Sequence, residues 1–368
     1  MVNISASDAH VTIIVLTWNS MADIDGCLSS IINQTYMNYE VIVVDSCSND
    51  KTIEHIRDNY PSVRVVPLGD NLGYRQGNNA GMHLAEGEFV VICNDDVEVE
   101  SDWLKGMVEA MQDEDVGIVT PMILMYQDRD VINASGNTLH YSGMCGPRGK
   151  GEPRSLHQEK TYVSAVSGCC FMIRRELMIQ LGYFSSDFDR LDTGWHASFE
   201  EVDLSWRAAM RGYATAYAPE AVMYHKYRQP KLFSSRFGAY EWGRYLAILR
   251  NYSILTIFIL LPVLAVQEMI AWAYAFSKGK GHLKAKAGVM RWLLFHPREW
   301  LEMRRLVQKK RMVSDFMVVM RLDSKIDLFN SQSGNRMAKV LNQFFGVISL
   351  LYYKALLACL RVQDYIMR

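Results

Sequence analysis

The sequence predicts an α/β fold, with a mostly parallel sheet covered by helices on both faces, followed by a helical region of different character. Three observations support this prediction. Short β-branched runs alternate with helical patterns over the first hundred residues, which is typical of a parallel sheet. Polar residues follow several of these runs at their carboxyl ends. Beyond residue 230 the balance of charge reverses and long apolar stretches appear.

The strand and helix signals of the first part come in regular alternation. Continuous apolar runs predict strands buried on both faces, and apolar residues at helical spacing predict the helices between them. The predicted strands are VTIIVLT at 11–17, EVIVVD at 40–45, VRVVPL at 63–68 and EFVVICND at 88–95. The predicted helices follow the first strand around 24–32, occupy 52–60, and open from the segment NLGYRQGNNAG at 71–81.

Three polar groups end predicted strands: Thr17, Asp45 and the cluster Asn94-Asp95-Asp96. Each alone could be a helix cap or a solvated strand end. Ligands of parallel sheets bind beyond the carboxyl ends of the strands, so we expect these groups to line one crevice. Adjacent carboxylates repel one another unless a cation or hydrogen bonds compensate. Because magnesium is usually held by one or two carboxylates plus phosphates, the pattern predicts Mg²⁺ or Mn²⁺ bridging an acid and a diphosphate.

The later part of the α/β region is less regular. Residues 126–160 are expected to form loops with short strands. The segment VSGCCFMIRRE, from Val166, predicts a strand that turns into a helix. The segment FEEVDLSWRAAMRGY, from Phe199, predicts a helix ending near Gly212, where a left-handed cap is wanted. We therefore expect residues 1–230 to form one domain.

The charge distribution separates this domain from residues 231–368. Residues 1–230 hold 17 basic and 32 acidic side chains, whereas residues 231–368 hold 22 and 8, although the net charge of the whole chain is -1. The two parts are therefore expected to face different partners. Residues 278–311 interleave 11 Lys and Arg with Trp, Leu and Phe, as an interfacial helix on anionic lipid requires.

Two apolar stretches, at 251–276 and 344–360, each contain a charge, Glu268 and Lys354 respectively. Neither is a clean membrane span. We expect residues 231–368 to form a basic, apolar helical region that associates with an anionic membrane surface, forms homo-oligomers, or does both. The alternative is a soluble helical domain in which both stretches are buried core helices.

The seven cysteines form no CxxC pair and are odd in number, which argues against a disulfide framework and a zinc site. The first residues, MVNISASDAH, carry no pattern of a secretory signal. The α/β domain is therefore expected on the cytoplasmic side of a membrane, and no nucleic-acid partner is expected.

The motifs of residues 10–228 resemble glycosyltransferase family 2, of the GT-A fold, and most closely its rhamnosyltransferase-like branch. The matching segments are VTIIVLTWNS, VIVVDSCSNDKT, NLGYRQGNNAG, ICNDDVEV, SGCCFMIRRE, FEEVDLSWRAAMRGY and YAPEAVMYH. The resemblance implies inverting, metal-dependent transfer of a sugar from a UDP- or dTDP-linked donor to a hydroxyl of a glycan acceptor. Such enzymes act in the assembly of cell-surface polysaccharides and glycans. A polyprenyl-linked acceptor is favoured, because a membrane-bound basic tail would bring the active site to it.

The resemblance also implies roles for individual residues. The positions that match contacts to the nucleotide and donor sugar are Thr17, Asn19, Asp45, Asn71, Gly73, Asn79, Asn94, Asp95 and Gly168. Asn94 replaces the first acid of the family's Asp-x-Asp motif, while Asp96 matches its metal-binding acid. His225 matches a histidine that approaches the metal and diphosphate. Glu201 stands where the catalytic base is usually Asp, which leaves Glu200 as a rival base.

Four further residues have weaker assignments. Trp195 and His196 could contact the acceptor sugar. Arg207 and Arg211 could assist the diphosphate, or could pair with acids on their own helix, such as Asp203.

Other functions fit the sequence less well. A sugar nucleotidyltransferase would need a glycine-rich, basic loop after the first strand, where this chain has TWNSMADID. A nicotinamide-dependent dehydrogenase would need GxGxxG at that place. A catalytically inactive membrane scaffold would not need the acids Asp95, Asp96 and Glu201.

Overall fold

The computed structural model describes residues 8–191, 199–227, 233–325 and 336–367. They belong to two compact units. Unit 1 comprises the chain up to Asn137, Pro147–Phe184 and Tyr213–Gln229, and unit 2 comprises Thr138–Gly146, Ser185–Gly212 and Pro230–Arg368. The expected boundary at residue 230 is therefore one of several points at which the chain passes between the units.

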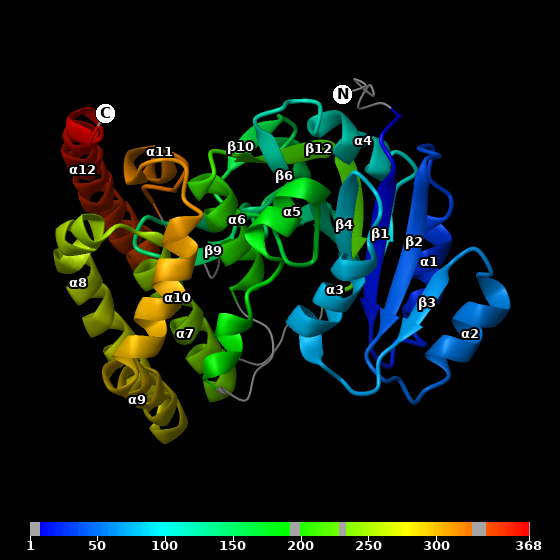
Figure 1. Ribbon diagram of the computed structural model, residues 1–368, viewed down its shortest axis with the longest axis horizontal. Coiled ribbons are helices and arrows are strands. Elements are labelled where there is room, and N and C mark those ends of the chain that lie inside the picture. The colour runs from blue at the N-terminus through cyan, green and yellow to red at the C-terminus, as the bar shows by residue number, and fades with distance from the viewer. Residues whose placement is uncertain (1–7, 192–198, 228–232, 326–335, 368) are drawn as a thin grey trace. The chain divides into compact units, whose positions relative to one another are not determined.

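Unit 1 is built on a mixed sheet, which has ten strands in the described residues, in the order β10-β12-β6-β11-β4-β1-β2-β3 with β5 beside β12 and β7 beside β6 (Figure 1). The strands are β1 Val11–Thr17, β2 Tyr39–Asp45, β3 Arg64–Pro67, β4 Phe89–Asn94, β5 Val97–Val99, β6 Val116–Met125, β7 Asp128–Ala134, β10 Thr161–Val163, β11 Cys170–Arg174 and β12 Ala214–His225. A separate two-stranded sheet joins β8, Asn137–Leu139, to β9, Cys145–Pro147.

The strands β4, β1, β2 and β3 are parallel, as predicted. Their register places Thr17 opposite Asp45, and Leu16 opposite Asn94. The polar residues that follow the strands therefore meet at one edge of the sheet. Beyond β4 the sheet becomes mixed, because β11 runs antiparallel to both β4 and β6. The predicted α/β fold is confirmed, and its parallel character is strongest in the first four strands.

Helices of unit 1 connect these strands: α1 Ile24–Ile31, α2 Thr52–Asn59, α3 Gly73–Leu84, α4 Trp103–Ala110 and α5 Arg175–Leu181. Glycines let α3 approach the sheet closely. A Cβ on Gly77 would lie 2.5 Å from Leu16 Cδ1, and one on Gly81 would lie 2.5 Å from Ile14 Cγ2. Because real Cβ atoms cannot come so close, larger residues would push α3 away from the ends of β1 and β2.

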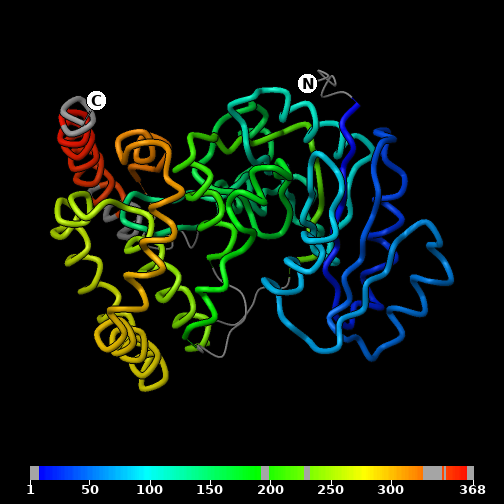
Figure 2. Tube along the Cα trace, in the orientation of Figure 1, coloured from blue at the N-terminus to red at the C-terminus, as the bar shows by residue number. Residues whose placement is uncertain are grey.

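Unit 2 is helical apart from short segments. Its helices are α6 Glu200–Met210, η3 Ser186–Arg190 (a 3₁₀ turn), α7 Ser234–Asn251, α8 Ile254–Lys278, α9 Lys280–Phe295, α10 Pro297–Lys309, α11 Asp315–Val319 and α12 Arg336–Met367. Figure 2 traces α7 to α12 from yellow-green to red. The predicted helix from Phe199 is α6, and Gly212 beyond it has the expected positive φ, +95°.

The two apolar stretches of the sequence lie in α8 and α12. By length and composition alone, Ile254–Lys278 and Phe345–Val362 could each cross a membrane. Only 11% and 17% of their most apolar windows, respectively, are buried. A core helix of a soluble domain would be mostly buried, so these values argue against that alternative.

A buried charge cluster holds α6 to the rest of unit 2. Asp203 is fully buried and accepts hydrogen bonds from Arg207 Nε at 2.6 Å and Arg250 Nη2 at 2.5 Å. Arg250 also donates to Asp187 Oδ2 at 2.5 Å. Burial acts to raise the pKa of Asp203, but the neighbouring guanidinium groups of Arg207 and Arg250 outweigh it and hold the pKa below its ordinary value. The cluster fixes the orientation of α6, which carries both predicted candidates for the catalytic base.

Replacing Asp203 by Asn is expected to lower the free energy of unfolding by about 3–5 kcal/mol, because two buried guanidinium groups lose their carboxylate partner. Urea unfolding of the full chain at pH 7 measures this change. The exposed pair between Arg190 and Glu299, 3.8 Å apart, supplies the control: Glu299→Gln should cost less than about 1 kcal/mol.

The stabilisation by Asp203 should depend on pH in a defined direction. Its folded pKa is lowered, so its contribution is complete above the ordinary value of 3.8 and is lost as the pH falls through the folded pKa. The difference between the wild type and Asp203→Asn should therefore shrink in acid. Equal losses for Asp203→Asn and Glu299→Gln at pH 7 would contradict the cluster's role.

Candidate functional site

Asp45 is the last residue of β2 and is fully buried. Its Oδ2 accepts a hydrogen bond from Ser48 N at 2.9 Å. Its Oδ1 is buried and has no hydrogen-bond partner among the described residues. Beside it, the carbonyl of Thr17 accepts from Ser46 N at 2.8 Å. Leaving a buried carboxylate oxygen unpaired costs free energy. A ligand that donates a hydrogen bond to Oδ1 of Asp45 would remove this cost.

The loops that follow β1 and β2 are tied together by Asn19. Its backbone N donates to Ser48 Oγ at 2.8 Å, and its Oδ1 accepts from Asn49 N at 2.8 Å. Asn19 and Cys47 both have left-handed backbones, with φ of 52° and 64°. Such conformations are uncommon outside glycine and cluster at functional sites. Asn19 therefore holds together the two loops that follow β1 and β2.

Three residues predicted to contact the donor, Asn71, Gly73 and Asn79, lie before or within α3. Asn71 Oδ1 accepts from Gly73 N at 3.0 Å, and Gly73 has a φ of 70°. Both amide atoms of Asn79 bind the backbone of Phe184, with Nδ2 to O at 3.0 Å and N to Oδ1 at 3.1 Å. The side chain of Asn79 thus holds a loop, and its expected contact with the donor stays a prediction. The neighbouring Asn78 has a buried Oδ1 without a hydrogen-bond partner in the described chain.

Gly168 lies between α3 and the end of β4. Its carbonyl accepts from Tyr74 Oη at 2.6 Å. The next carbonyl, of Cys169, accepts from Asn94 N at 3.0 Å. These bonds bring two predicted donor-contacting positions, Gly168 and Asn94, to the same edge of the sheet.

Asp96 and His225 come together through strand pairing. β5 begins directly after Asp96 and runs antiparallel to β12, with Val97 opposite His225. His225 Nε2 consequently lies 3.4 Å from Asp96 Oδ1. The backbone of Asp96 is fixed too, because its carbonyl accepts from Lys226 N at 2.9 Å. The two predicted metal ligands are therefore neighbours.

Asn133 fixes the tautomer of the buried His225. The amide oxygen of Asn133, on β7, lies 3.1 Å from His225 Nδ1. An amide oxygen only accepts, so Nδ1 carries a proton, and Nε2 is the ring nitrogen that faces Asp96. Metal-binding histidines commonly hold their second ring nitrogen in this way. Asn133 belongs to no motif and could not be predicted from the sequence; it reaches the site because β7 pairs with β6.

The neighbouring acid, Asp95, is electrostatically strained. Burial raises its pKa, and the negative charge of Asp96 adds to the effect, whereas the nearby hydroxyls of Thr17 and Ser20 oppose it. A divalent cation beside the two carboxylates would favour their charged forms and remove the repulsion. The electrostatics of this edge therefore suit a bound cation.

The donor set fits a cation that is shared with a substrate. Among the described residues, no group of three or more His, Cys, Asp and Glu converges on a point, as a metal cage would require. Asp96 and His225 form a pair only. Magnesium bound to substrate phosphates needs no more than one or two protein carboxylates. The pair thus fits Mg²⁺ or Mn²⁺ that arrives with a diphosphate, and does not fit a structural metal site.

Glu200 and Glu201 begin α6 in unit 2. The residue before them, Phe199, has a left-handed φ of 74° and lies against Gly243, where any side chain would collide with it. Glu200 is buried, whereas Glu201 is only partly so. Burial raises the pKa of the Glu201 carboxyl. A carboxylate with a raised pKa is a better proton acceptor, so Glu201 has the properties expected of a base.

The residues with weaker assignments are described only in part. Arg207 donates to Asp203 on the same helix, as the second of its two predicted roles requires. Arg211 donates to the carbonyl of Lys310 at 3.2 Å. Trp195 and His196 lie outside the described residues.

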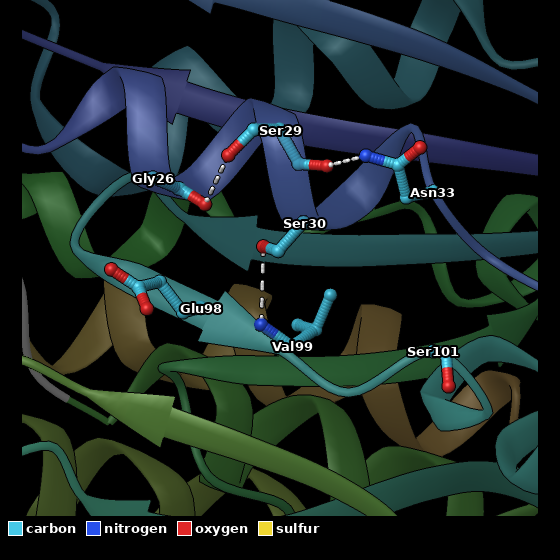
Figure 3. Close-up of a pocket in the computed structure, with 7 residues that line it drawn as sticks. All are labelled: Gly26, Ser29, Ser30, Asn33, Glu98, Val99 and Ser101. Carbon is cyan, nitrogen blue, oxygen red and sulfur yellow. Dashed lines mark hydrogen bonds between the residues drawn. The ribbon is translucent and has the colours of Figure 1, made fainter.

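A hollow of about 400 Å³ between α1 and β5 is distinct from this site (Figure 3). Its lining contains none of the predicted donor or metal residues. Its polar groups are largely satisfied internally, since Ser29 Oγ donates to Gly26 O at 3.3 Å and Ser30 Oγ accepts from Val99 N at 3.1 Å. The hollow is part of the surface of α1 and carries no chemistry of its own.

Known proteins are similar to this chain in its α/β region. Residues 12–182 match the family model of Glycosyl transferase family 2. Poly-beta-1,6-N-acetyl-D-glucosamine synthase of Staphylococcus aureus is 24% identical over 221 residues, which are 58% of this chain and 48% of that protein. The uncharacterized protein y4gI of Sinorhizobium fredii is 31% identical over 228 residues, 58% of this chain and 24% of that protein. This chain therefore spans about half or less of the length of these relatives.

Solved structures share the fold. The crystal structure of GalNAc-T7 with UDP, GalNAc and Mn²⁺ has a TM-score of 0.53 at 17% identity, covering 65% of this chain and 48% of that one. A mannosyltransferase from Pyrobaculum calidifontis in complex with GDP-Man and Mn²⁺ has a TM-score of 0.51 at 21% identity, covering 82% and 86%. These similarities confirm the predicted GT-A fold. The match to the family model agrees with the predicted glycosyltransferase, and the rhamnosyltransferase-like branch stays a prediction.

Proposed function

We propose that this protein is an inverting, divalent-cation-dependent glycosyltransferase that moves a sugar from a nucleoside diphosphate sugar to a hydroxyl of a glycan acceptor. The observation that carries the proposal is the meeting of three features at the ends of adjacent strands. These are the unpaired buried oxygen of Asp45, the acids Asp95 and Asp96, and the ring nitrogen Nε2 of His225 that faces Asp96. A nucleotide with a negative diphosphate and its cation satisfies all three.

The donor would bind with its base at Asp45, whose free oxygen accepts a hydrogen bond from a ring N–H or amino group. Thr17, Asn94 and Gly168 would line the path from the base to the sugar. Asp96 and His225 would hold Mg²⁺ or Mn²⁺, which neutralises the charge that develops on the diphosphate as it leaves. Asp95 lies beside them, where we assign it to the ribose. UDP and dTDP are the nucleotides that we expect.

Transfer would proceed by a single displacement. The acceptor oxygen attacks the anomeric carbon from the side opposite the diphosphate, the bond from that carbon to the phosphate oxygen breaks, and Glu201 takes the hydroxyl proton. The configuration at the anomeric carbon is thereby inverted. The nucleoside diphosphate leaves with the electron pair of the broken bond.

The acceptor class follows from unit 2. Its exposed apolar helices and basic residues support association with an anionic membrane, with the α/β unit on the cytoplasmic side. A polyprenyl-linked saccharide is therefore the acceptor we propose, in the assembly of a polysaccharide or glycan. Asn94, in place of an acid, supports the rhamnosyltransferase-like branch and a deoxyhexose or hexose as the transferred sugar.

Replacing Asp45 by Asn should weaken the binding of UDP or dTDP in the presence of Mn²⁺ by about 10–100-fold, as expected when a hydrogen bond to a charged group is lost. Calorimetric titration of the purified full chain measures this without an acceptor. Asp58→Asn, which neutralises an exposed acid on α2, should leave the affinity unchanged. Wild-type protein that binds neither nucleotide, or equal affinity for Asp45→Asn, would contradict the proposed donor site.

A further inference from the structure

One face of α8 is exposed along its entire length and is apolar. Ile254, Phe258, Leu261, Met269 and Phe276 recur at helical spacing, and each is about half exposed or more. The first charged residue of the helix, Glu268, follows Leu261 by seven positions and therefore borders this stripe. A single exposed apolar residue is ordinary, but a continuous stripe over 25 residues marks an interaction surface.

The polar residues in the middle of α8, Gln267 and Glu268, are bound within unit 2. Glu268 accepts from Arg244 Nη2, on α7, at 2.9 Å and lies 3.0 Å from Lys286 Nζ, on α9. Gln267 binds Ser142, and Arg244 and Lys286 are themselves buried. The charge that interrupts the apolar stretch is therefore neutralised on the protein side of the helix.

These contacts decide between two ways in which α8 can meet a membrane. Its 25 residues could reach across the hydrocarbon layer. In that case α9, held to α8 by the bond between Lys286 and Glu268, would bring its exposed Lys284 and Arg291 into the hydrocarbon. Each unpaired charge there is energetically unfavourable. An orientation along the surface of the membrane buries the apolar stripe and leaves these charges in water.

α12 has the same character. Val347, Leu351 and Val362 are exposed, and Lys354 and Arg361 lie exposed among them. Tyr352 on this helix donates a hydrogen bond to the carbonyl of Ile259 on α8, so the two helices are neighbours. Exposed charges in the middle of a lipid-facing helix are unfavourable in a span, but at the interface their stems can reach the headgroups.

We propose that α8 and α12 lie in the plane of the membrane interface and that neither crosses the membrane. The occupant of their exposed apolar faces is an anionic lipid surface, because Lys278, Lys280 and Lys284 border the apolar stripe with positive charge. This inference deepens the proposed membrane association, on which it rests. It makes the protein monotopic, with both ends of each helix on the same side of the membrane.

The apolar stripe is tested by flotation of the full chain with vesicles of phosphatidylcholine and phosphatidylglycerol. The wild type should float with these vesicles and bind less to phosphatidylcholine alone. Met269→Glu should reduce binding about tenfold or more, because it places a charge where the helix enters the lipid. Met37→Glu, at a methionine that is 81% exposed in unit 1, should bind as the wild type does.

The orientation is tested by labelling with a membrane-impermeant maleimide on inside-out vesicles from expressing cells. Cys47 and Cys359 are the exposed cysteines in the described chain. A first variant, Cys359→Ser, reports the side of unit 1 through Cys47. A second, with Cys47→Ser, Cys359→Ser and Ser277→Cys, reports the far end of α8. Both should be labelled equally without detergent.

The outcomes separate the two levels of the proposal. Labelling of Ser277→Cys only after detergent would overturn the in-plane orientation and leave membrane association standing. Failure of the wild type to float would overturn membrane association itself, and with it this inference. A dimer in solution that Met269→Glu converts to a monomer, together with no flotation, would assign the stripe to a second copy of the chain. Nucleotide binding by unit 1 is independent of all three.

Discussion

Asp96→Asn is expected to lower the rate of sugar transfer by about 10³-fold or more and to abolish its dependence on Mn²⁺. Asp96 is the carboxylate that faces Nε2 of His225, at 3.4 Å. The amide keeps the shape of the side chain but removes the negative charge that would hold the cation. A cation contributes several kcal/mol to the transition state by neutralising the leaving group, and each 1.36 kcal/mol is a factor of ten in rate.

The same variant should lose binding of Mn²⁺ in the presence of UDP or dTDP, measured by electron paramagnetic resonance. This readout does not depend on the acceptor, so it tests the metal assignment even before the transferred sugar is known. His225→Gln should weaken binding of Mn²⁺ less, because it removes a neutral ligand and leaves the carboxylate.

A matched control and a stability measurement show whether the loss of activity is caused by unfolding of the variant. The control is Glu109→Gln, which removes a carboxylate on α4. The side chain of Glu109 is 55% exposed and its Oε1 lies 4.0 Å from Lys105 Nζ, so this variant should retain full activity. Asp96→Asn should melt within a few degrees of the wild type, because its carboxylate is partly exposed. Near-normal transfer by Asp96→Asn would refute the assignment of the metal site.

The sequence was sufficient to predict the parallel half of the sheet and the polar groups at its edge. This was possible because β1, β2 and β4 are continuous apolar runs, buried almost throughout, and a parallel register brings their carboxyl ends together. Asp45 and Asn94 could therefore be placed by chain order alone. The antiparallel insertion of β11 between β4 and β6 could not, since no local pattern encodes which strand an arriving segment will join.

The details of the site depend on contacts that only the fold supplies. Asn133 orients His225 from a β7 that has no motif. Asn79, which matched a donor position, binds the backbone of Phe184, and the neighbouring Asn78 has a buried oxygen without a hydrogen-bond partner in the described chain. Adjacent residues of a helix point in directions about 100° apart, so a motif locates a helix turn more reliably than it locates a single side chain.

The second large effect is expected at the base. Glu201→Gln should reduce the turnover number by about 10²–10⁴-fold, the usual contribution of a general base. The affinity for the nucleoside diphosphate should be unchanged, because Glu201 acts on the acceptor hydroxyl. Steady-state kinetics with saturating donor, together with titration calorimetry of UDP or dTDP, separate the two quantities.

The pH profile supplies an independent signature. Burial raises the pKa of Glu201 above its ordinary value of 4.5, and the base works only when it is deprotonated. Turnover should therefore fall as the pH drops through this raised pKa, and the acid limb should be missing from the residual activity of Glu201→Gln. Glu201→Asp restores the residue usual in the family but withdraws the carboxylate by about one ångström, which is enough to cost about 10²-fold.

Glu200→Gln distinguishes the rival base. Glu200 is 2% exposed at the start of α6, whereas Glu201 is only partly buried, so Glu200 has less access to an acceptor. We expect Glu200→Gln to change the stability of the fold more than the chemistry, and to preserve the acid limb of the pH profile. If Glu200→Gln instead removes that limb while Glu201→Gln keeps it, the proton passes to Glu200, and Glu201 has another role.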